Sequence, residues 1–291
     1  MTAIFGILAI LLLMLVILLA LSAGLFALSV VLSFSIAWYE RINGDPTVAE
    51  ERRHAFAARL MLTEFACLLV TLLLRPLGWL PTRIAGGPVR RTPVILLHGL
   101  SQNRSCLLVL HWRLRAAGFD RVVSINTPPG RDLQALVDKL AGTVEQLRSA
   151  AGVKQVHLVG HSMGGILARC YLQLQGGAPH VATCVTLGSP HLGSKLAPFA
   201  VSSLGRDLLP GSNLLTRLNA EPLPAGVRFT AIYSRHDNII VPADHGRLDG
   251  ADNFELAGLG HTTMLFSRQV AEAVVTALNK DRNHESVTMK P

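Results

Sequence analysis

The first 39 residues of the chain contain no Asp, Glu, Lys or Arg, and residues 3–37 are almost wholly apolar. A helix needs about 20 such residues to cross the hydrocarbon core of a bilayer, so this run is long enough to span one. A cleaved signal peptide is the alternative, but it would need a basic N-terminal region and an apolar region of about 7–15 residues. Neither is present, and we expect an uncleaved membrane helix over residues 3–37.

A second apolar stretch occupies residues 60–80, but its uninterrupted core between Glu64 and Arg75 is only ten residues long. That is short for a span, so a helix lying in the membrane interface is the alternative to a second spanning helix. The loop between the two stretches is basic and carries Arg41, Arg52, Arg53 and Arg59. The positive-inside rule places such a loop in the cytoplasm. We expect a hairpin with the rest of the chain on the periplasmic side of a bacterial inner membrane, whereas a surface-lying second helix would leave it in the cytoplasm.

The net charge of +8 belongs entirely to the part of the chain that follows these stretches. Residues 1–82 hold five basic and five acidic residues, and the remainder holds 22 basic and 14 acidic residues. A basic domain beside a bilayer is attracted to anionic lipid head groups. The basic residues are scattered and are not clustered with aromatic residues, so we expect no nucleic-acid binding. We divide the chain into a membrane-anchor region (1–82), a globular domain (83–280) and a polar tail (281–291).

From Pro93 onward, short apolar runs alternate with segments of helical periodicity. The expected strands cover residues 94–97, 121–125, 156–159, 181–187, 229–233 and 253–256. The expected helices cover residues 107–117, 131–150, 166–174 and 267–278. Such alternation predicts an α/β fold, with right-handed crossovers and a mostly parallel sheet flanked by helices. Functional side chains are then expected at the carboxyl ends of the strands.

One turn between an expected strand and an expected helix has the composition of a nucleophile elbow. Residues 160–165 read Gly-His-Ser-Met-Gly-Gly and fit the pattern G-x-S-x-G. In such an elbow the serine has a strained backbone, and the flanking residues must be small to avoid clashes. A strand-to-helix turn with an incidental serine is the alternative. The strand before it and the helix after it favour a nucleophilic Ser162.

A serine hydroxyl is a good nucleophile only beside a general base that is itself oriented by an acid. In this type of fold the three residues follow one another along the chain in the order Ser, Asp/Glu, His. Among the eleven histidines, His261 is best placed, because it lies in a loop between the last expected strand and the last expected helix. Asp237 follows strand 229–233, where the acid is expected. Its rivals lie within the next crossover and are Asp244, Asp249 and Asp252.

An oxyanion that forms on the attacked carbonyl group needs preorganised backbone N–H donors. One donor is expected to be the amide of Met163, the residue after the nucleophile. The other is expected in the loop after the first strand, at residues 98–100, and is assigned to the amide of Leu100. A simple turn at His98-Gly99 is the alternative interpretation of that loop.

We expect no cofactor and no metal. The four cysteines show no C-x-x-C spacing and are most simply buried thiols: Cys67, Cys106, Cys170 and Cys184. A metal site near the expected acid would have to use His236, Asp237, Asp244 or His245. The spacing of these residues matches no known ligand pattern.

Residues 195–226 lack a clear period but are rich in leucine. One interpretation is a lid or an acyl-chain wall over the site. The other is an ordinary helical insertion packed on the domain. The sequence favours neither.

Several motifs together resemble the bacterial triacylglycerol lipases of the α/β-hydrolase superfamily, of both the small Bacillus type and the Pseudomonas/Burkholderia type. Residues 98–100 resemble the oxyanion loop of these lipases, 160–165 their elbow, 186–194 their T-x-G-[ST]-P-H-x-G-[ST] segment, and 248–253 with 258–270 the stretch that carries the histidine. The resemblance runs from Pro93 to Val270, about 60% of the chain. The chain departs from the family in its two N-terminal apolar segments and in lacking calcium ligands of the Pseudomonas type.

The resemblance implies an α/β-hydrolase fold and an ester hydrolase, a lipase or esterase, with Ser162, His261 and Asp237 as its triad. The membrane tether and the apolar segment 195–226 favour lipid-like esters as substrates. Two alternatives stay open. The same triad could pass the acyl group to an alcohol or a lipid, as an acyltransferase does, or the fold could be catalytically silent and serve as a binding protein.

Overall fold

The computed structural model describes residues 2–44, 54–81, 84–127, 132–200 and 202–288. Six parallel strands form one sheet in the order β2-β1-β3-β4-β5-β6. The strands are β1 (Val94–Leu97), β2 (Val122–Ile125), β3 (Val156–His161), β4 (Val181–Leu187), β5 (Arg228–Ser234) and β6 (Asp252–Leu256). All six expected strands are therefore present, with bounds that differ by no more than two residues from those expected.

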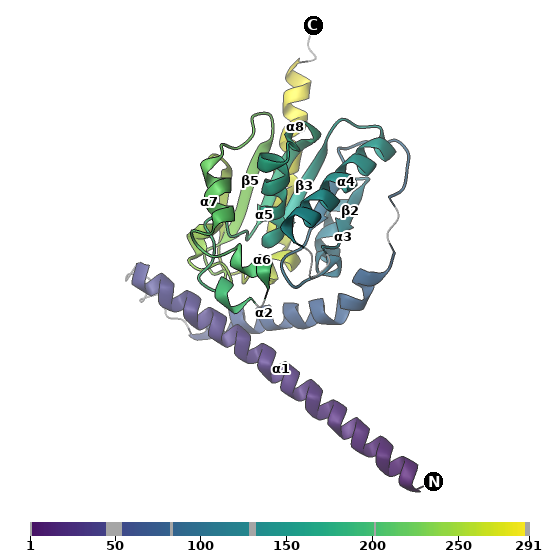
Figure 1. The fold of residues 1–291 in the computed structure, drawn as a ribbon, viewed down its shortest axis with the longest axis vertical. Coiled ribbons are helices and arrows are strands. Elements are labelled where there is room, and N and C mark those ends of the chain that lie inside the picture. The colour runs from purple at the N-terminus through teal and green to yellow at the C-terminus, as the bar shows by residue number, and fades with distance from the viewer. Residues whose placement is uncertain (1, 45–53, 82–83, 128–131, 201, 289–291) are drawn as a thin grey trace.

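Helices cover both faces of the sheet (Figure 1). The helices of the domain are α3 (Leu108–Ala116), α4 (Leu133–Ala151), α5 (Met163–Arg169), α6 (Ser203–Arg206), α7 (Asn213–Ala220) and α8 (Arg268–Thr288). Short 3-10 and π turns cover Arg75–Trp79 (η2), Arg104–Leu107 (η3), Cys170–Leu174 (η4), Ala178–His180 (η5), Ala197–Phe199 (η6), Ala243–Gly246 (η7) and Thr263–Phe266 (η8). One core cluster joins the sheet to α4, α5 and α7, and a second joins its other face to α3 and α8.

The ends of α4 show how local sequence fixes an element. The side chain of Asp132 accepts a hydrogen bond from the Ala135 amide at 2.8 Å and so caps the start of the helix. Gly152 ends it in the left-handed conformation, with φ of 66°. The buried residues between the caps follow the helical period: Leu136, Val137, Leu140, Val144, Leu147 and Ala151.

Residues 195–226 form short turns and two small helices. Leu204, Leu208, Leu215 and Leu218 belong to the core cluster that also holds α4 and α5. Phe199, by contrast, is 74% exposed. Much of this segment is thus packed on the domain, as the insertion interpretation expects, while Phe199 lies at the surface.

Two helices precede the domain: α1 (Thr2–Gly44) and α2 (His54–Leu74). By their length and apolar composition alone, both helices could cross a membrane. They pack on each other through a small cluster around Val30, Phe34 and Leu60. The first helix extends beyond the expected range 3–37, and the second helix starts before the expected residue 60. The second helix ends at Leu74, just before Arg75-Pro76, because proline does not continue a helix.

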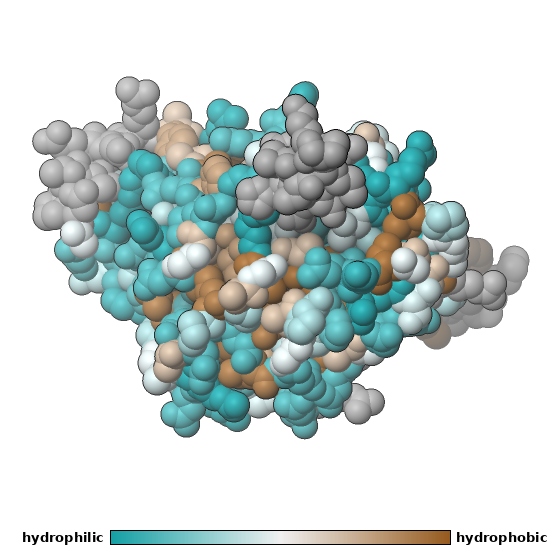
Figure 2. All heavy atoms as spheres, turned by 90° about the horizontal axis from the view of Figure 1, so that it is seen from above, coloured by the Kyte–Doolittle hydropathy of each residue, from teal (hydrophilic) through white to brown (hydrophobic). Residues whose placement is uncertain are grey.

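The N-terminal helices lie at the carboxyl ends of the strands. In Figure 1, α2 runs across this end of the domain and α1 extends obliquely away from it. Large exposed apolar residues follow one another along α1 from Phe5 to Leu32. The face of the domain away from these helices is largely hydrophilic at its rim (Figure 2). The extended apolar surface of the molecule therefore lies beside the carboxyl edge of the sheet.

Candidate active site

The strand register brings three loops to one edge of the sheet. Leu97 of β1 lies opposite Gly160 of β3, which lies opposite Thr186 of β4. The loop after β1, the turn after β3 and the loop after β4 therefore leave the sheet side by side. Open α/β sheets place their functional groups at this edge.

Ser162 lies in the turn between β3 and α5 with φ of 55° and ψ of −125°. This backbone conformation is strained for a residue other than glycine. The turn closes because its neighbours lack side chains. A Cβ atom on Gly160 would lie 2.5 Å from the carbonyl carbon of Gly164, and one on Gly164 would lie 2.5 Å from the carbonyl oxygen of Leu97. The local structure is that of the elbow expected from the sequence.

His261 and Asp237 are brought together by loops that follow β6 and β5. The two side chains are almost fully buried, and a distance of 2.9 Å joins His261 Nδ1 to Asp237 Oδ2. A carboxylate oxygen accepts, so Nδ1 carries the proton and Nε2 is left as the basic nitrogen. The other oxygen of Asp237 accepts from the amides of Ile239 and Ile240 at 2.8 and 2.9 Å. Both carboxylate oxygens of Asp237 are thus fixed by hydrogen bonds.

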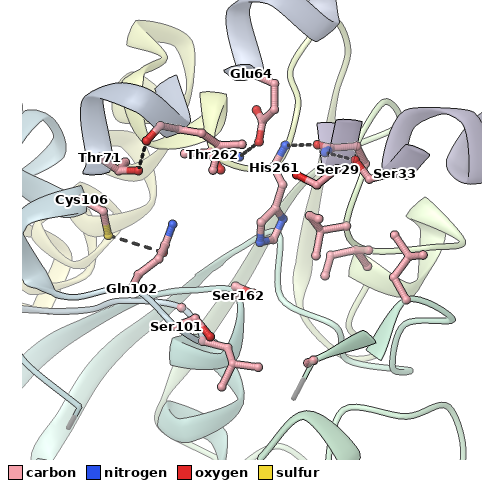
Figure 3. Close-up of a pocket in the computed structure, with 18 of the residues that line it drawn as sticks. Ser29, Ser33, Glu64, Thr71, Ser101, Gln102, Cys106, Ser162, His261 and Thr262 are labelled. Carbon is pink, nitrogen blue, oxygen red and sulfur yellow. Dashed lines mark hydrogen bonds between the residues drawn. The ribbon is translucent and has the colours of Figure 1, made fainter. Parts of the chain in front are cut away.

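The three rival acids lie elsewhere. Asp252 pairs with Lys280 at the edge of the sheet. Asp244 and Asp249 line a separate cavity. The His261 ring points from its loop into the pocket towards Ser162 (Figure 3). No hydrogen bond joins Ser162 to His261 among the described residues, and such bonds often tighten only when substrate binds.

The surroundings of His261 act on its pKa in opposite directions. Burial lowers the pKa, but the charge and the hydrogen bond of Asp237, together with the charge of Glu64, raise it above its ordinary value. His161 lies behind the ring, with centroids 4.6 Å apart, and its Nε2 donates to the carbonyl oxygen of His261 at 3.2 Å. Burial holds the pKa of His161 well below its ordinary value, so this neighbour stays neutral.

The loop after β1 carries Leu100, whose amide is the second oxyanion donor expected from the sequence. The pKa of His98 is lowered to about 4, mainly by burial, so its ring is neutral. Its Nδ1 donates to the Gly99 carbonyl at 2.8 Å and its Nε2 accepts from the Thr127 amide at 2.9 Å, which holds the loop. Neither the Leu100 nor the Met163 amide donates a hydrogen bond to another described residue. Both are therefore available to a ligand.

Ser162 and His261 line a pocket of about 390 Å³ whose wall is largely apolar. The domain supplies the loop at residues 99–103 and parts of the 190–208 segment. The two N-terminal helices also line it, through Phe26, Ser29, Val30 and Ser33 of α1 and Glu64, Leu68, Thr71 and Leu72 of α2. The sequence did not indicate that these helices take part. The one available signal was an acidic residue, Glu64, within an apolar helix.

The remaining sequence candidates have other surroundings. His191, in the segment at 186–194, is buried, and its ring contacts the Thr186 hydroxyl at 2.9 Å and the Arg169 guanidinium at 3.3 Å. All four cysteines are unpaired, three of them buried and Cys67 half-buried. In the described ranges, no group of three or more His, Cys, Asp or Glu residues could hold a metal ion. The chemistry of the pocket is thus that of a buried acid, a base and a strained hydroxyl.

Comparison with known proteins gives three kinds of similarity. Residues 129–203 match the family described as a PGAP1-like alpha/beta domain. Over 131 residues the chain is 32% identical to a triacylglycerol lipase of Pseudarthrobacter phenanthrenivorans. The alignment covers 40% of this chain and 39% of that lipase. The same identity over the same length relates it to a triacylglycerol lipase of Burkholderia plantarii, with 40% and 34% covered. The aligned part thus spans well under half the length of these relatives.

Among solved structures, the mature form of the Bacillus licheniformis lipase BlEst2 superposes with a TM-score of 0.57 at 19% identity. The match covers 66% of this chain and 96% of that one. The chain therefore has the α/β-hydrolase fold, and the resemblance to bacterial lipases expected from its motifs is confirmed. The parallel sheet flanked by helices agrees with the fold class expected from the sequence.

Proposed function

We propose that this chain is a membrane-anchored serine hydrolase, a lipase or esterase, that cleaves carboxylic esters of lipid-like substrates. One observation carries the proposal: a strained serine at a strand-to-helix turn shares an apolar pocket with a histidine that a buried aspartate holds. The similarity to two triacylglycerol lipases supports ester hydrolysis as the reaction class.

The reaction follows an acyl-enzyme route. Ser162 Oγ attacks the ester carbonyl carbon while His261 Nε2 takes the hydroxyl proton, and Asp237 stabilises the resulting imidazolium. The amides of Leu100 and Met163 donate to the oxyanion of the tetrahedral intermediate. The C–O bond to the alcohol then breaks, and the alcohol leaves with the proton from His261. Water attacks the acyl-enzyme with His261 as base, which releases the acid and restores Ser162.

The pocket favours an apolar acyl chain. Phe26 and Val30 of α1 and Leu68 and Leu72 of α2 line one side of it. The same part of α1 continues into the exposed apolar surface that a bilayer would cover. An ester within the membrane can therefore pass along α1 to Ser162 without crossing water.

The placement of α2 bears on which side of the membrane the domain lies. Its start packs on the domain through Phe56, whose ring lies edge-on to His236 at 5.0 Å. Its middle docks through Glu64, and the turn after it is held by Arg104 and Asn126, which donate to the Gly78 carbonyl at 3.0 and 2.7 Å. A helix that is tied to a polar domain at its start, its middle and the turn after it does not fit a position across the hydrocarbon core.

These contacts favour the surface-lying alternative for α2 over the hairpin expected from the sequence. We therefore propose that α1 alone spans the membrane. The positive-inside rule places the arginine-bearing loop after α1 in the cytoplasm, and the domain then lies on the cytoplasmic side instead of the periplasmic side. A fluorescent protein that folds only in the cytoplasm, fused after Pro291, should be bright. A periplasm-active phosphatase fusion that is active instead would overturn this placement.

The enzyme activity is tested by the Ser162→Ala variant of the full chain in membranes. Hydrolysis of a p-nitrophenyl ester series and labelling by a fluorophosphonate probe should both disappear, with the protein level unchanged. Labelling that is absent already in the wild type would indicate a silent fold. Product analysis with competing alcohols separates hydrolysis from acyl transfer.

A further inference from the structure

Glu64 is the one acidic residue of α2, and its side chain is buried in the interface with the domain, at 1% exposure. A carboxylate costs much free energy to bury unless its oxygens are satisfied by hydrogen bonds. In an otherwise apolar helix, such a residue is expected to have a specific partner. Its partners show what the helix contributes to the pocket.

The Glu64 carboxylate accepts three hydrogen bonds from the two residues that follow His261. The Thr262 amide donates to Oε1 at 2.7 Å. The Thr263 amide and the Thr263 hydroxyl donate to Oε2 at 2.9 and 2.7 Å. These amides are at the start of the turn η8, whose first N–H groups have no partner within the turn itself. Glu64 thus caps, from another helix, the backbone that carries His261 (Figure 3).

The backbone before His261 is shaped to admit this carboxylate. A Cβ atom on Gly260 would lie 2.5 Å from Glu64 Oε2 and 3.1 Å from Asn238 Oδ1. Asn238 Oδ1 accepts the His261 amide at 2.9 Å. The loop is therefore held on one side by a residue next to Asp237 and on the other side by α2.

We propose that Glu64 is a positioning residue, which acts through the backbone of residues 262–263 to hold the His261 ring between Asp237 and Ser162, so that the active site is complete only while α2 is docked. The inference rests on the proposed hydrolase function. It adds that the anchor region belongs to the catalytic apparatus and is more than a tether. Glu64 does not touch the substrate carbonyl in this scheme.

Glu64 also acts on His261 through its charge. Among the described residues, the groups that act on or adjoin His261 are Asp237 from the loop after β5, Glu64 from α2 and His161 from β3. Arg75 and Cys106 line the same pocket. The pocket-lining residues of α1 are not titratable. Burial lowers the pKa of His261, and the negative charge of Glu64 is one of the contributions that raise it. Removing this charge should lower that pKa, so that His261 becomes neutral, and active as a base, at a lower pH.

The test compares Glu64→Gln with wild type in the full-length, membrane-bound protein. Glutamine has the same shape as glutamate, but its NH₂ group is a donor and cannot accept the hydrogen bonds that Thr262 and Thr263 donate to the carboxylate. We expect kcat to fall about 10- to 100-fold, as for a small misplacement of a catalytic group, with KM within about twofold of wild type. The acid limb of the pH profile should move to lower pH. A role in folding alone would lower the amount of active protein without moving that limb.

Glu40→Gln is the matched control, because Glu40 also joins an N-terminal helix to the domain, through an ion pair with Lys195 at 2.5 Å. It should keep the wild-type kcat and pH profile. Fluorophosphonate labelling counts the competent sites in every variant. If Glu64→Gln keeps the wild-type kcat and acid limb while Ser162→Ala is inactive, the positioning role is wrong and the hydrolase function stands. If Ser162→Ala remains active, the hydrolase function itself fails.

Thr263→Val decides the matter if Glu64→Gln does not accumulate in membranes. It removes the hydroxyl donor of the 2.7 Å contact, together with that hydroxyl's contact with the Cys67 thiol, and preserves the side-chain shape. We expect kcat to fall by about threefold to tenfold at constant KM, because one of three bonds to the carboxylate is lost. Unchanged kcat in this variant would contradict the proposal.

Discussion

Asn238 Nδ2, one residue from the acid of the site, donates a hydrogen bond of 2.8 Å to Ser33 Oγ on α1. The other end of the same amide accepts the His261 N–H. Through one buried side chain, the first helix of the chain is therefore connected to His261, the proposed catalytic base. With the contacts of Glu64, both N-terminal helices hold the loop of His261, one on each side.

Ser33→Val should loosen this connection. The variant leaves Asn238 Nδ2 buried without its acceptor, which typically costs about 1–3 kcal/mol. We expect a lower melting temperature and a smaller kcat, with both measured in detergent micelles. Ser22→Val is the control, since among the described residues the Ser22 hydroxyl bonds only to the Leu18 carbonyl of its own helix. Equal melting temperatures and rates for the two variants would show that the Asn238 contact has no role.

The pH profile should follow the protonation of His261. Its pKa lies above the ordinary value of about 6.5, and the base is active only when neutral, so kcat/KM should rise with pH to a midpoint above about 6.5. Asp237→Asn removes the largest contribution that raises this pKa, so the midpoint should move to lower pH. The variant should also lose about 10⁴ in kcat, because the imidazole is no longer held in the required tautomer. A midpoint that stays in place would mean that another group controls the acid limb.

Replacement of Gly164 by alanine should prevent the elbow from closing. The added Cβ would lie 2.5 Å from the Leu97 carbonyl oxygen, a backbone atom that cannot move without shifting β1. We expect destabilisation of at least about 1–3 kcal/mol and loss of fluorophosphonate labelling. Thermal unfolding and labelling measure the two effects.

Gly142→Ala is the matched control for that substitution. Gly142 is exposed in the middle of α4, and a Cβ there meets nothing within 4 Å. Alanine in a helix interior is more favourable than glycine by about 0.5–1 kcal/mol, so this variant should be slightly more stable and fully active. If Gly164→Ala behaved like this control, the tight approach to Leu97 would not be a constraint.

Most of the sheet could be predicted because most of its strands are short, continuous runs of apolar residues. Residues 94–97 are apolar throughout, and β1 is buried on both faces. The edge strand β6, at Asp252–Leu256, has mostly exposed residues, and the sequence still indicated a strand at residues 253–256. The segment at 195–226 could not be resolved from the sequence, because its leucines follow no single period, although the structure buries or partly buries all of them.

Three site residues could be placed at one edge because each follows the end of a strand: Ser162 after β3, Asp237 after β5 and His261 after β6. The part played by the N-terminal helices could not be predicted. The bond between Glu64 and Thr262 joins residues 198 positions apart, and no local pattern reports a contact at that distance. Hydropathy described α2 as a membrane segment, in which a single carboxylate only shortens the apolar run.

The length of the acyl chain that the enzyme prefers should depend on the apolar wall of the pocket. Ala197 is 8% exposed and lines the same pocket as Phe26 and Leu72 of the N-terminal helices. Ala197→Phe adds a large side chain to this wall and should exclude long chains. Each lost methylene contact is worth about 1 kcal/mol, so kcat/KM for a p-nitrophenyl decanoate should fall at least about tenfold. The value for the acetate should change by less than about twofold. Leu192→Phe, at an exposed position outside this pocket, is the control. A uniform loss across the ester series in Ala197→Phe would indicate that the pocket does not hold the acyl chain.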